Sequence, residues 1–244
     1  MHISDSHPRK ASLDLRHRLT DGLDKGFVAS AGLIAHGRGE AFDYLLGEKT
    51  SLQAKEAERA ASAMLLAAKK PVISVNGNVA ALCPNNVVKL AKAVGARLEV
   101  NLYYRTRERE EKIRDVLKKA GARKVWGVGV NIRTVPGLDS ERAKSDKAIL
   151  EADVVLVMLE DGDRTEYLKK MGKKVVAVDL NPLSRTAKTA DITIVDNVAR
   201  AVPKMTAYAK GFGKLDSKRL NAIVEAFDNR ENLKRMEASV RKGV

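Results

Sequence analysis

The chain has 244 residues, of which 44% are hydrophobic and 31% charged, and this composition is that of a folded protein rather than a disordered or fibrous one. Residues 2–19 are rich in charge and lack an apolar core, so no signal peptide is expected, and the longest apolar runs, such as 154–159, are too short to cross a membrane. The single cysteine, Cys83, cannot form an internal disulfide, which fits a reducing compartment. We therefore expect a cytoplasmic protein without a membrane partner.

The predicted elements alternate along the chain between helices and short runs of Val and Ile. Helices are predicted at 52–68 (capped by Thr50 or Ser51), 84–94 (ended by Gly95) and 106–121 (capped by Thr106), and 216–242 is predicted to form one or two amphipathic helices. Strands are predicted at 71–75, 97–100, 124–128, 153–158, 174–178 and 191–195, with a polar connection at 131–144. This alternation predicts an α/β fold: a Rossmann-like doubly wound, mainly parallel sheet of about six strands with flanking helices. We divide the chain into an N-terminal helical segment packing on the core (1–70), the α/β core (71–212) and a C-terminal helical segment (213–244).

The net charge of +14 indicates negatively charged partners, but it does not choose among nucleic acid, acidic lipid and phosphorylated metabolites. Residues 107–114 alternate in sign, as a solvated helix face does, so part of the excess charge is interpreted as structural or solubilising. Because no zinc finger, aromatic RNA-binding strand or basic zipper is present, we expect no nucleic-acid partner. An RNA-binding protein is kept as an alternative, which would bind polynucleotides with a steep dependence on salt.

Polar residues stand immediately after five of the predicted strands. They are Asn76-Gly77-Asn78, Asn101, Glu160-Asp161-Gly162-Asp163, Asp179-Leu180-Asn181 and Asp196-Asn197. Since the carboxyl ends of parallel strands lie along one edge of the sheet, these groups are expected to converge on one ligand site. The alternative is that each cluster only forms a turn or a helix cap, which is the commonest use of these residues.

Phosphate-binding patterns are incomplete. There is no P-loop motif, and Gly127-Val128-Gly129 lacks the third glycine of a dinucleotide fingerprint. In 36–40, two glycines would let backbone N–H groups approach a ligand, Arg38 could form a fork to phosphate oxygens, and a helix would start at Glu40. A glycine-rich turn with a surface arginine is the alternative. The four histidines, His2, His7, His17 and His36, suggest no catalytic triad.

Taken together, several segments resemble archaeal phosphopantothenate synthetases in order and spacing. They are 6–9, 32–45, 74–78, 99–106, 159–165 and 179–186, and the likeness extends from about 6 to 203. The last forty or so residues match no motif of the family. The resemblance implies a Rossmann-like, homodimeric ligase of coenzyme A biosynthesis that joins 4-phosphopantoate to β-alanine, uses ATP and Mg²⁺, and releases AMP and pyrophosphate through an acyl-adenylate.

The resemblance also implies roles for particular residues. The ATP site would comprise Arg16, Arg38, Asp179, Leu180, Asn181, Arg185, Thr186, Asp196 and Asn197. Candidates for binding 4-phosphopantoate, chosen by position, are Asn76, Asn78, Asn101, Arg105 and Thr106, and the catalytic candidates are Arg38, Arg105, Asp161 and Asp163, the two aspartates organising metal or substrate ammonium. No protein ligand of the metal is assigned. A nicotinamide-dependent oxidoreductase, or another nucleotide-binding α/β protein, is the alternative; the oxidoreductase would need the glycine fingerprint that is missing.

Overall fold

The computed structural model describes residues 3–129, 132–134 and 144–243. Its strands are β1 (Pro71–Val75), β2 (Arg97–Val100), β3 (Arg133–Thr134), β4 (Lys144–Ser145), β5 (Val154–Met158), β6 (Lys174–Val178) and β7 (Ile192–Ile194). Its helices are α1 (Lys10–Asp24), α2 (Ser30–Leu45), α3 (Leu52–Ala67), α4 (Gly77–Leu82), α5 (Pro84–Val94), α6 (Arg107–Lys119), α7 (Lys147–Leu150), α8 (Gly162–Lys170), α9 (Arg185–Thr189), α10 (Val198–Phe212), α11 (Ser217–Glu225) and α12 (Asn229–Lys242).

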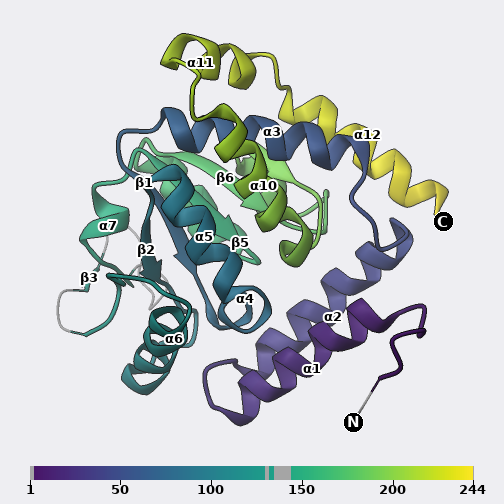
Figure 1. Ribbon diagram of the computed structural model, residues 1–244, viewed down its shortest axis with the longest axis vertical. Helices are drawn as coiled ribbons and strands as arrows, with labels where there is room; N and C mark the ends of the chain where they lie inside the picture. Colours follow the sequence, from purple (N-terminus) through teal and green to yellow (C-terminus); the bar gives the residue numbers. More distant parts are fainter. Residues whose placement is uncertain (1–2, 130–131, 135–143, 244) are drawn as a thin grey trace.

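Five parallel strands form the central sheet in the order β2-β1-β5-β6-β7 (Figure 1). The chain first adds a strand on one side of β1 and then continues on the other side, so the order reverses between β1 and β5. This reversal defines a doubly wound fold, in which ligands bind outside the carboxyl ends of the strands at the point of reversal. The prediction of an α/β, mainly parallel architecture is confirmed.

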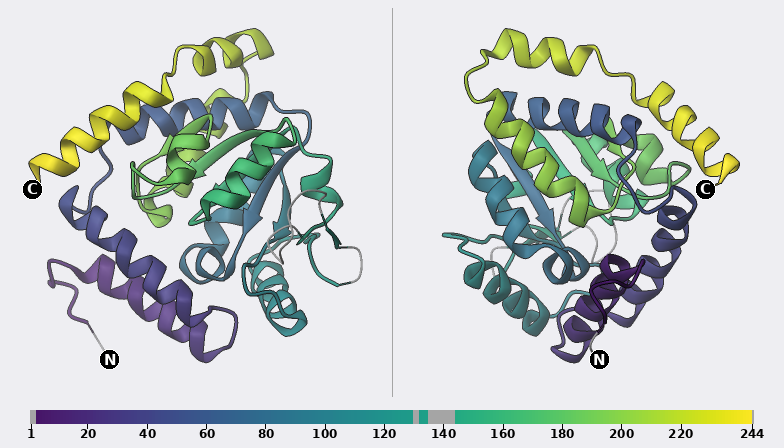
Figure 2. Two further views of the ribbon diagram at one scale, coloured as in Figure 1. Left: turned by 180° about the vertical axis from the view of Figure 1, so that it is seen from behind. Right: turned by 45° about the vertical axis from the view of Figure 1, so that its right-hand side comes forward.

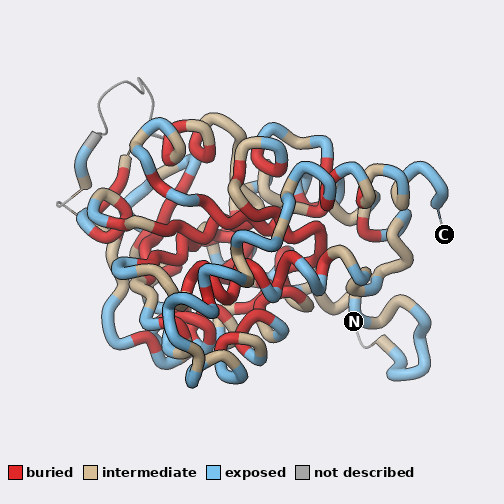
Figure 3. The backbone as a smooth tube through the Cα atoms, turned by 90° about the horizontal axis from the view of Figure 1, so that it is seen from above, coloured by how far each residue is buried: buried red, intermediate tan, exposed pale blue. Residues whose placement is uncertain are grey.

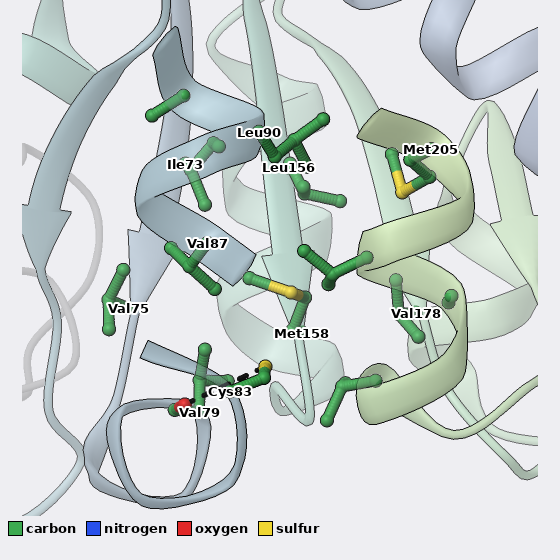
Figure 4. Close-up of a cluster of buried hydrophobic side chains, with 14 of the residues drawn as sticks. Ile73, Val75, Val79, Cys83, Val87, Leu90, Leu156, Met158, Val178 and Met205 are labelled. Carbon is green, nitrogen blue, oxygen red and sulfur yellow. Dashed lines mark hydrogen bonds between the residues drawn. The ribbon is translucent and has the colours of Figure 1, made fainter. Parts of the chain in front are cut away.

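Both faces of the sheet are buried under helices. Alternate strand residues such as Ile73 and Leu156 pack against α3, α5 and α10, and their neighbours such as Val72 and Val155 pack against α7 and α8. Figure 4 shows the first of these two cores, where side chains of α5 and α10 meet those of β1, β5 and β6. Because neither face meets water, β1, β5, β6 and β7 are mostly apolar, and the buried residues lie in the middle of the molecule (Figure 3).

The strand predictions at 71–75, 97–100 and 174–178 are confirmed, and those at 153–158 and 191–195 are confirmed in shorter form. The strand predicted at 124–128 is wrong. Only a single bridge joins Trp126 to Glu99, because Gly127 turns the chain away with a φ of +79°. Of the predicted connection at 131–144, Arg133–Thr134 pairs with Lys144–Ser145 in an antiparallel ladder, and most of the rest lies outside the described residues.

The predicted helix boundaries hold where caps were recognised. Ser51 caps α3, Thr106 caps α6, and Gly95 ends α5 in the left-handed conformation. The helix start predicted at Glu40 is wrong, because α2 begins at Ser30 and runs through both glycines of 36–40. Among the described residues no helix has the length and apolarity needed to span a membrane.

The terminal helices lie around the core. Helices α1 and α2 form an antiparallel pair beside the carboxyl ends of the strands, and α12 extends past α3 (Figures 1 and 2). Helix α3, which the sequence groups with the N-terminal segment, packs on α10 and on β7. The division of the chain into three parts stays a prediction.

Candidate active site

Helix α2 crosses the carboxyl ends of the strands in their order in the sheet. Before α2, the carbonyl of Phe27 accepts a hydrogen bond from Arg109 of α6, which follows β2. The carbonyl of Gly32 accepts one from Asn78, after β1, at 2.8 Å. A Cβ placed on Gly39 would lie 3.5 Å from Leu180, after β6. The helix therefore forms a wall opposite the strand ends.

The end of α2 is fixed by a buried charged cluster, which comprises Asp43, Asp196, Asn197, Arg200 and Thr50. Arg200 of α10 donates to Asp43 of α2 at 2.5 Å and also pairs with Asp196, after β7. Asp196 accepts a hydrogen bond from Thr50, and Asn197 caps α10 and contacts Asp43. Burial raises the pKa of Asp196, which Arg200 opposes. This cluster holds α2 against the last strand.

Between α2 and the strand ends lies a cavity of about 610 Å³. The predicted site residues that line it are Arg38, Asn76, Asn78, Asn101, Asp161, Asp179, Leu180, Asn181, Arg185 and Thr186. They come from α2 and from the segments after β1, β2, β5 and β6. The expectation that strand-end residues converge is therefore met for the nine of them that follow strands, at the point where the strand order reverses.

Asn76 connects the two strands at that point. Its Oδ1 accepts a hydrogen bond from the N–H of Val79 and caps α4, while its Nδ2 donates to the carbonyls of Met158 and Leu159 after β5. Leu159 adopts a φ of +51°, a conformation that costs a non-glycine residue roughly 1–3 kcal/mol. Asn76 therefore acts as a helix cap and also lines the cavity, while its contact with a ligand stays a prediction.

The β6 end of the cavity is lined by hydrogen-bonded carboxylates. Asp179 accepts from the N–H of Asn181 and from the hydroxyl of Ser184, and burial raises its pKa. Asp161 caps α8 through the N–H of Arg164, and Thr186 donates to the carbonyl of Glu160. These contacts hold the two loops side by side.

The β2 end contains a buried polar network. Asn101 lies between Arg164, which donates to its Oδ1, and Glu99, which accepts from its Nδ2. Burial raises the pKa of Glu99 to about 7, while the N–H groups of Asp146 and Ile149 stabilise its charged form. The side-chain amide of Asn101 is therefore fixed in orientation where it reaches the cavity.

Two arginines of the cavity form no ion pair with a carboxylate among the described residues. Arg38 is exposed on α2 and forms no hydrogen bond there; its charge acts on Asp179 only across space. Among the described residues, Arg109 donates only to the carbonyls of Tyr104 and Phe27, and its Nε is buried without a partner. Burial lowers the pKa of Arg109. A cation held beside a cavity without a paired carboxylate is suited to an anionic ligand.

Sequence reasoning missed Arg109 because the alternating charges of 107–114 suggested a solvated face. It also missed His36, whose imidazole lines the cavity, although the residue is only 7% exposed. His36 is the first residue of 36–40, but only the glycines, Arg38 and Glu40 of that pattern were given a role, and Arg109 belongs to no such pattern. The best indication that the sequence offers for Arg109 is its position. It follows the cap Thr106 by three residues and so lies in the first helical turn after β2.

Six predicted site residues do not line the cavity. Arg105 forms a buried pair with Glu110 at 2.5 Å, and Thr106 caps α6. Arg16 pairs with Glu40 in a separate shallow groove between α1 and α2. Asp163 pairs with Arg185 at the rim, and Asp196 and Asn197 belong to the charged cluster at the end of α2. Ligand contacts for all sixteen predicted site residues stay predictions.

The described residues contain no group of three or more His, Cys, Asp or Glu side chains placed to hold a metal ion. The carboxylates that line the cavity are Glu160, Asp161 and Asp179, and the last two accept hydrogen bonds from the protein. This arrangement fits Mg²⁺ that arrives with nucleotide phosphates, because such an ion keeps water and phosphate oxygens as most of its ligands.

The doubly wound sheet and this cavity define a Rossmann-like α/β protein whose ligand site, at the reversal of strand order, is suited to anionic ligands. Residues 53–243 match the family model described as phosphopantothenate/pantothenate synthetase. The chain belongs to this family, and the resemblance seen in the sequence is confirmed.

Relatives cover nearly the whole chain. The chain is 52% identical to the 4-phosphopantoate–β-alanine ligase of Thermococcus onnurineus, over 95% of this chain and 89% of that protein. It is 54% identical to the protein of the same name from Thermococcus kodakarensis, over 96% and 90% of the two chains. With that from Methanosarcina mazei the identity is 50%, over 95% and 91%.

Proposed function

We propose that the protein is an ATP-dependent ligase that condenses 4-phosphopantoate with β-alanine in the cytoplasm, to give 4′-phosphopantothenate, AMP and pyrophosphate. The names of its relatives support this activity, and their identity of about 50% extends over nearly the whole chain. The missing third glycine after Gly127 and Gly129 argues against the oxidoreductase alternative.

The observation that carries the proposal is the pair of arginines without ion-pair partners at the two ends of one cavity. Arg38 lies next to Gly39 and so near Leu180 at the β6 end, and Arg109 lies at the β2 end. A ligase that uses ATP and a phosphorylated acid must hold two anions side by side against their mutual repulsion. Two separated cations that are not paired with carboxylates meet this requirement.

In the proposed reaction, a carboxylate oxygen of 4-phosphopantoate attacks the α-phosphorus of ATP, the bond to the bridging oxygen breaks, and pyrophosphate leaves. The amine of β-alanine then attacks the acyl carbon, and AMP leaves. Mg²⁺ bound to the phosphates would neutralise charge on the leaving pyrophosphate. Arg38 would bind nucleotide phosphates, and Arg109 the phosphate of the acid. Catalysis then rests on positioning and electrostatics and needs no protein nucleophile.

A product assay tests this proposal. We expect AMP and pyrophosphate only when ATP, 4-phosphopantoate and β-alanine are all present, with unphosphorylated pantoate a poor substitute. Formation of ADP would indicate attack at the γ-phosphorus and overturn the adenylate mechanism. Product formation that does not depend on 4-phosphopantoate would overturn the assignment of the acid.

The proposal includes a homodimer. Large apolar side chains are exposed on α2 and at the start of α3, namely Ile34, Tyr44, Leu45 and Leu52, and a second copy of the chain would cover such a surface. We expect light scattering to give twice the mass of the chain, and the Ile34→Glu variant to shift towards monomer. A strict monomer in the wild type at working concentrations would contradict the dimer.

A further inference from the structure

Two glycines of α2 show which face of the helix meets the strand ends, and His36 lies on the same face. Gly32 contacts Asn78 at the β1 end, and Gly39 lies against Leu180 at the β6 end. His36 is four residues after Gly32 and three residues before Gly39, so the three residues lie on the same side of the helix. The helix rises about 1.5 Å per residue, so His36 lies roughly midway along a span of about 10 Å.

This midpoint lies opposite β5, the strand between β1 and β6 in the sheet. If the nucleotide binds near Leu180 and the acid near Arg109, the acyl carbon and the α-phosphorus must meet between the two ends. His36 is thus the titratable side chain of α2 that lines the middle of the cavity.

The imidazole is available for chemistry. It lines the cavity and forms no hydrogen bond with any of the described residues, although the residue is only 7% exposed. Neither ring nitrogen is among the fully buried side-chain atoms that lack a partner in the described part of the chain, so both keep some contact with solvent and can meet a ligand. The other polar side chains of the cavity that carry caps or strand contacts, such as Asn76 and Asp161, are already occupied.

The second half of the proposed reaction requires a base. β-Alanine is a zwitterion at neutral pH, and its ammonium group has no lone pair with which to attack. The nitrogen must lose one proton before attack and a second as the amide forms. AMP leaves as a phosphate monoester and needs no proton, so the chemistry calls for a proton acceptor near the acyl carbon and no strong acid.

We propose that His36 is the general base that accepts a proton from the ammonium group of bound β-alanine, which frees the amine to attack the acyl-adenylate. This inference rests on the proposed ligase function and adds a residue that carries out its second step. The first proton passes from the ammonium nitrogen to an imidazole nitrogen, the C–N bond forms, the bond from the acyl carbon to AMP breaks, and the second proton passes from the nitrogen to water. The imidazolium then releases its proton to solvent.

The surroundings keep the imidazole neutral at pH 7. Burial lowers the pKa of His36, and Arg16 of α1 adds to this effect, whereas Glu40 and Asp43 of α2 oppose it. The charged groups that line the cavity across from α2 are Arg109, Glu160, Asp161, Asp179 and Arg185. A neutral imidazole can accept a proton, and an imidazolium cannot, so amide formation should increase with pH as His36 loses its proton.

The test separates the two half-reactions in the His36→Gln variant. Exchange of labelled pyrophosphate into ATP, dependent on 4-phosphopantoate and measured without β-alanine, reports adenylate formation. We expect this exchange to stay within about threefold of wild type, while amide formation at saturating β-alanine falls by about 10²–10⁴-fold, the usual contribution of a general base. The control is His17→Gln on α1, which does not line the cavity and should change neither rate.

A second nucleophile sharpens the test. Hydroxylamine is mostly uncharged at neutral pH, so His36→Gln should form the hydroxamate at nearly the wild-type rate. With β-alanine, the rate of the variant should follow the fraction of free amine and keep increasing at alkaline pH, without the plateau of the wild type. Both results require a folded variant with an active adenylation step.

Three outcomes would overturn the inference. If His36→Gln forms the amide at the wild-type rate, no base is needed there. If it loses pyrophosphate exchange together with amide formation, His36 acts in adenylation or folding instead. If hydroxylamine reacts as slowly as β-alanine, the defect is not in proton transfer. A wild-type protein that shows no exchange with 4-phosphopantoate would instead refute the proposed function itself.

Discussion

Asn78 donates a hydrogen bond from Nδ2 to the carbonyl oxygen of Gly32 at 2.8 Å, and its side chain packs against the side of Gly32 that carries no Cβ. A Cβ at Gly32 would approach the Oδ1 of Asn78 to 2.4 Å, which is closer than van der Waals contact allows. The absence of a side chain at this position therefore lets α2 approach the carboxyl end of β1. The width of the cavity depends on this contact.

We predict that Gly32→Ala lowers ligase activity by an order of magnitude or more, because α2 must move away from the strand ends and geometry shifts of about 1 Å are costly in an active site. Thermal stability should change little, or fall by a few degrees. Activity and melting temperature of the purified variant, measured side by side, check the prediction. Full activity would show that α2 does not determine the cavity geometry.

The matched control lies on the same helix. A Cβ added to Gly37 would have nothing within 4 Å, so Gly37→Ala meets no steric obstacle. Alanine is a better helix residue than glycine, which should stabilise α2 by about 0.5–1 kcal/mol. We expect normal activity and a slightly raised melting temperature for this variant.

For Arg109→Ala we predict a loss of selectivity for the phosphorylated acid. A charge-assisted hydrogen bond contributes about 1.5–3 kcal/mol, so KM for 4-phosphopantoate should rise about 10–100-fold, with little change for pantoate. The ratio of kcat/KM for 4-phosphopantoate to kcat/KM for pantoate, measured on the same variant, checks the loss of selectivity. This ratio does not depend on the folded fraction, because both values come from the same sample. Arg107→Ala is the control, since Arg107 is exposed and pairs with Glu111. An unchanged ratio would remove Arg109 from the acid site.

The Arg38→Ala variant should affect the nucleotide instead. Arg38 is exposed and forms no ion pair or hydrogen bond with the described residues, so its removal should leave the free energy of unfolding nearly unchanged. We expect KM for ATP to rise by about 10-fold or more, with KM for 4-phosphopantoate retained. Steady-state kinetics with each substrate varied in turn would reveal the opposite pattern if the two arginines were assigned to the wrong ends.

The sequence was sufficient for most of the sheet because β1, β5, β6 and β7 are mostly apolar runs followed by turn or cap residues. Where a prediction from the sequence was wrong, the same local pattern was compatible with two different structures. The glycines of 36–40 suggested a loop, but they lie on a helix, and Gly39 allows α2 to pass close to Leu180. Tertiary contact, which no local pattern encodes, decided in favour of the helix.

The same limit applies to the site. Alternating charges at 107–114 describe a surface helix correctly for Arg107 and Glu111, yet Arg109 in the same run faces the cavity. Conversely, Arg105 and Thr106 follow β2 as a ligand-binding loop would, but the described structure uses them for an ion pair and a cap. Which side of an element faces the cavity depends on its packing, and charge patterns alone do not determine it.

Glu58 was not expected in the core at all. It lies on α3 with 0% exposure, and neither carboxyl oxygen has a hydrogen-bond partner among the described residues. Burial raises its pKa to about 8, and Asp196 contributes to the increase, while Lys204 and Lys55 oppose it. The carboxyl group is therefore mostly protonated in the folded protein at neutral pH.

This burial predicts a specific pH dependence of stability. Because the pKa of Glu58 is higher in the folded than in the unfolded chain, the folded state binds more protons between pH 4.5 and 8. Its contribution to the free energy of unfolding is therefore complete below pH 4.5 and falls as the pH rises to about 8, by at most about 1.4 kcal/mol per pH unit. Glu58→Gln should remove this decline and be several kcal/mol more stable than wild type at about pH 9, with similar stability at about pH 5. Urea unfolding at several pH values in this range measures the free energy of unfolding of both proteins. The control is Glu56→Gln, because Glu56 is an exposed residue of the same helix. If the pH dependence were the same for wild type and Glu58→Gln, Glu58 would be charged in the folded protein.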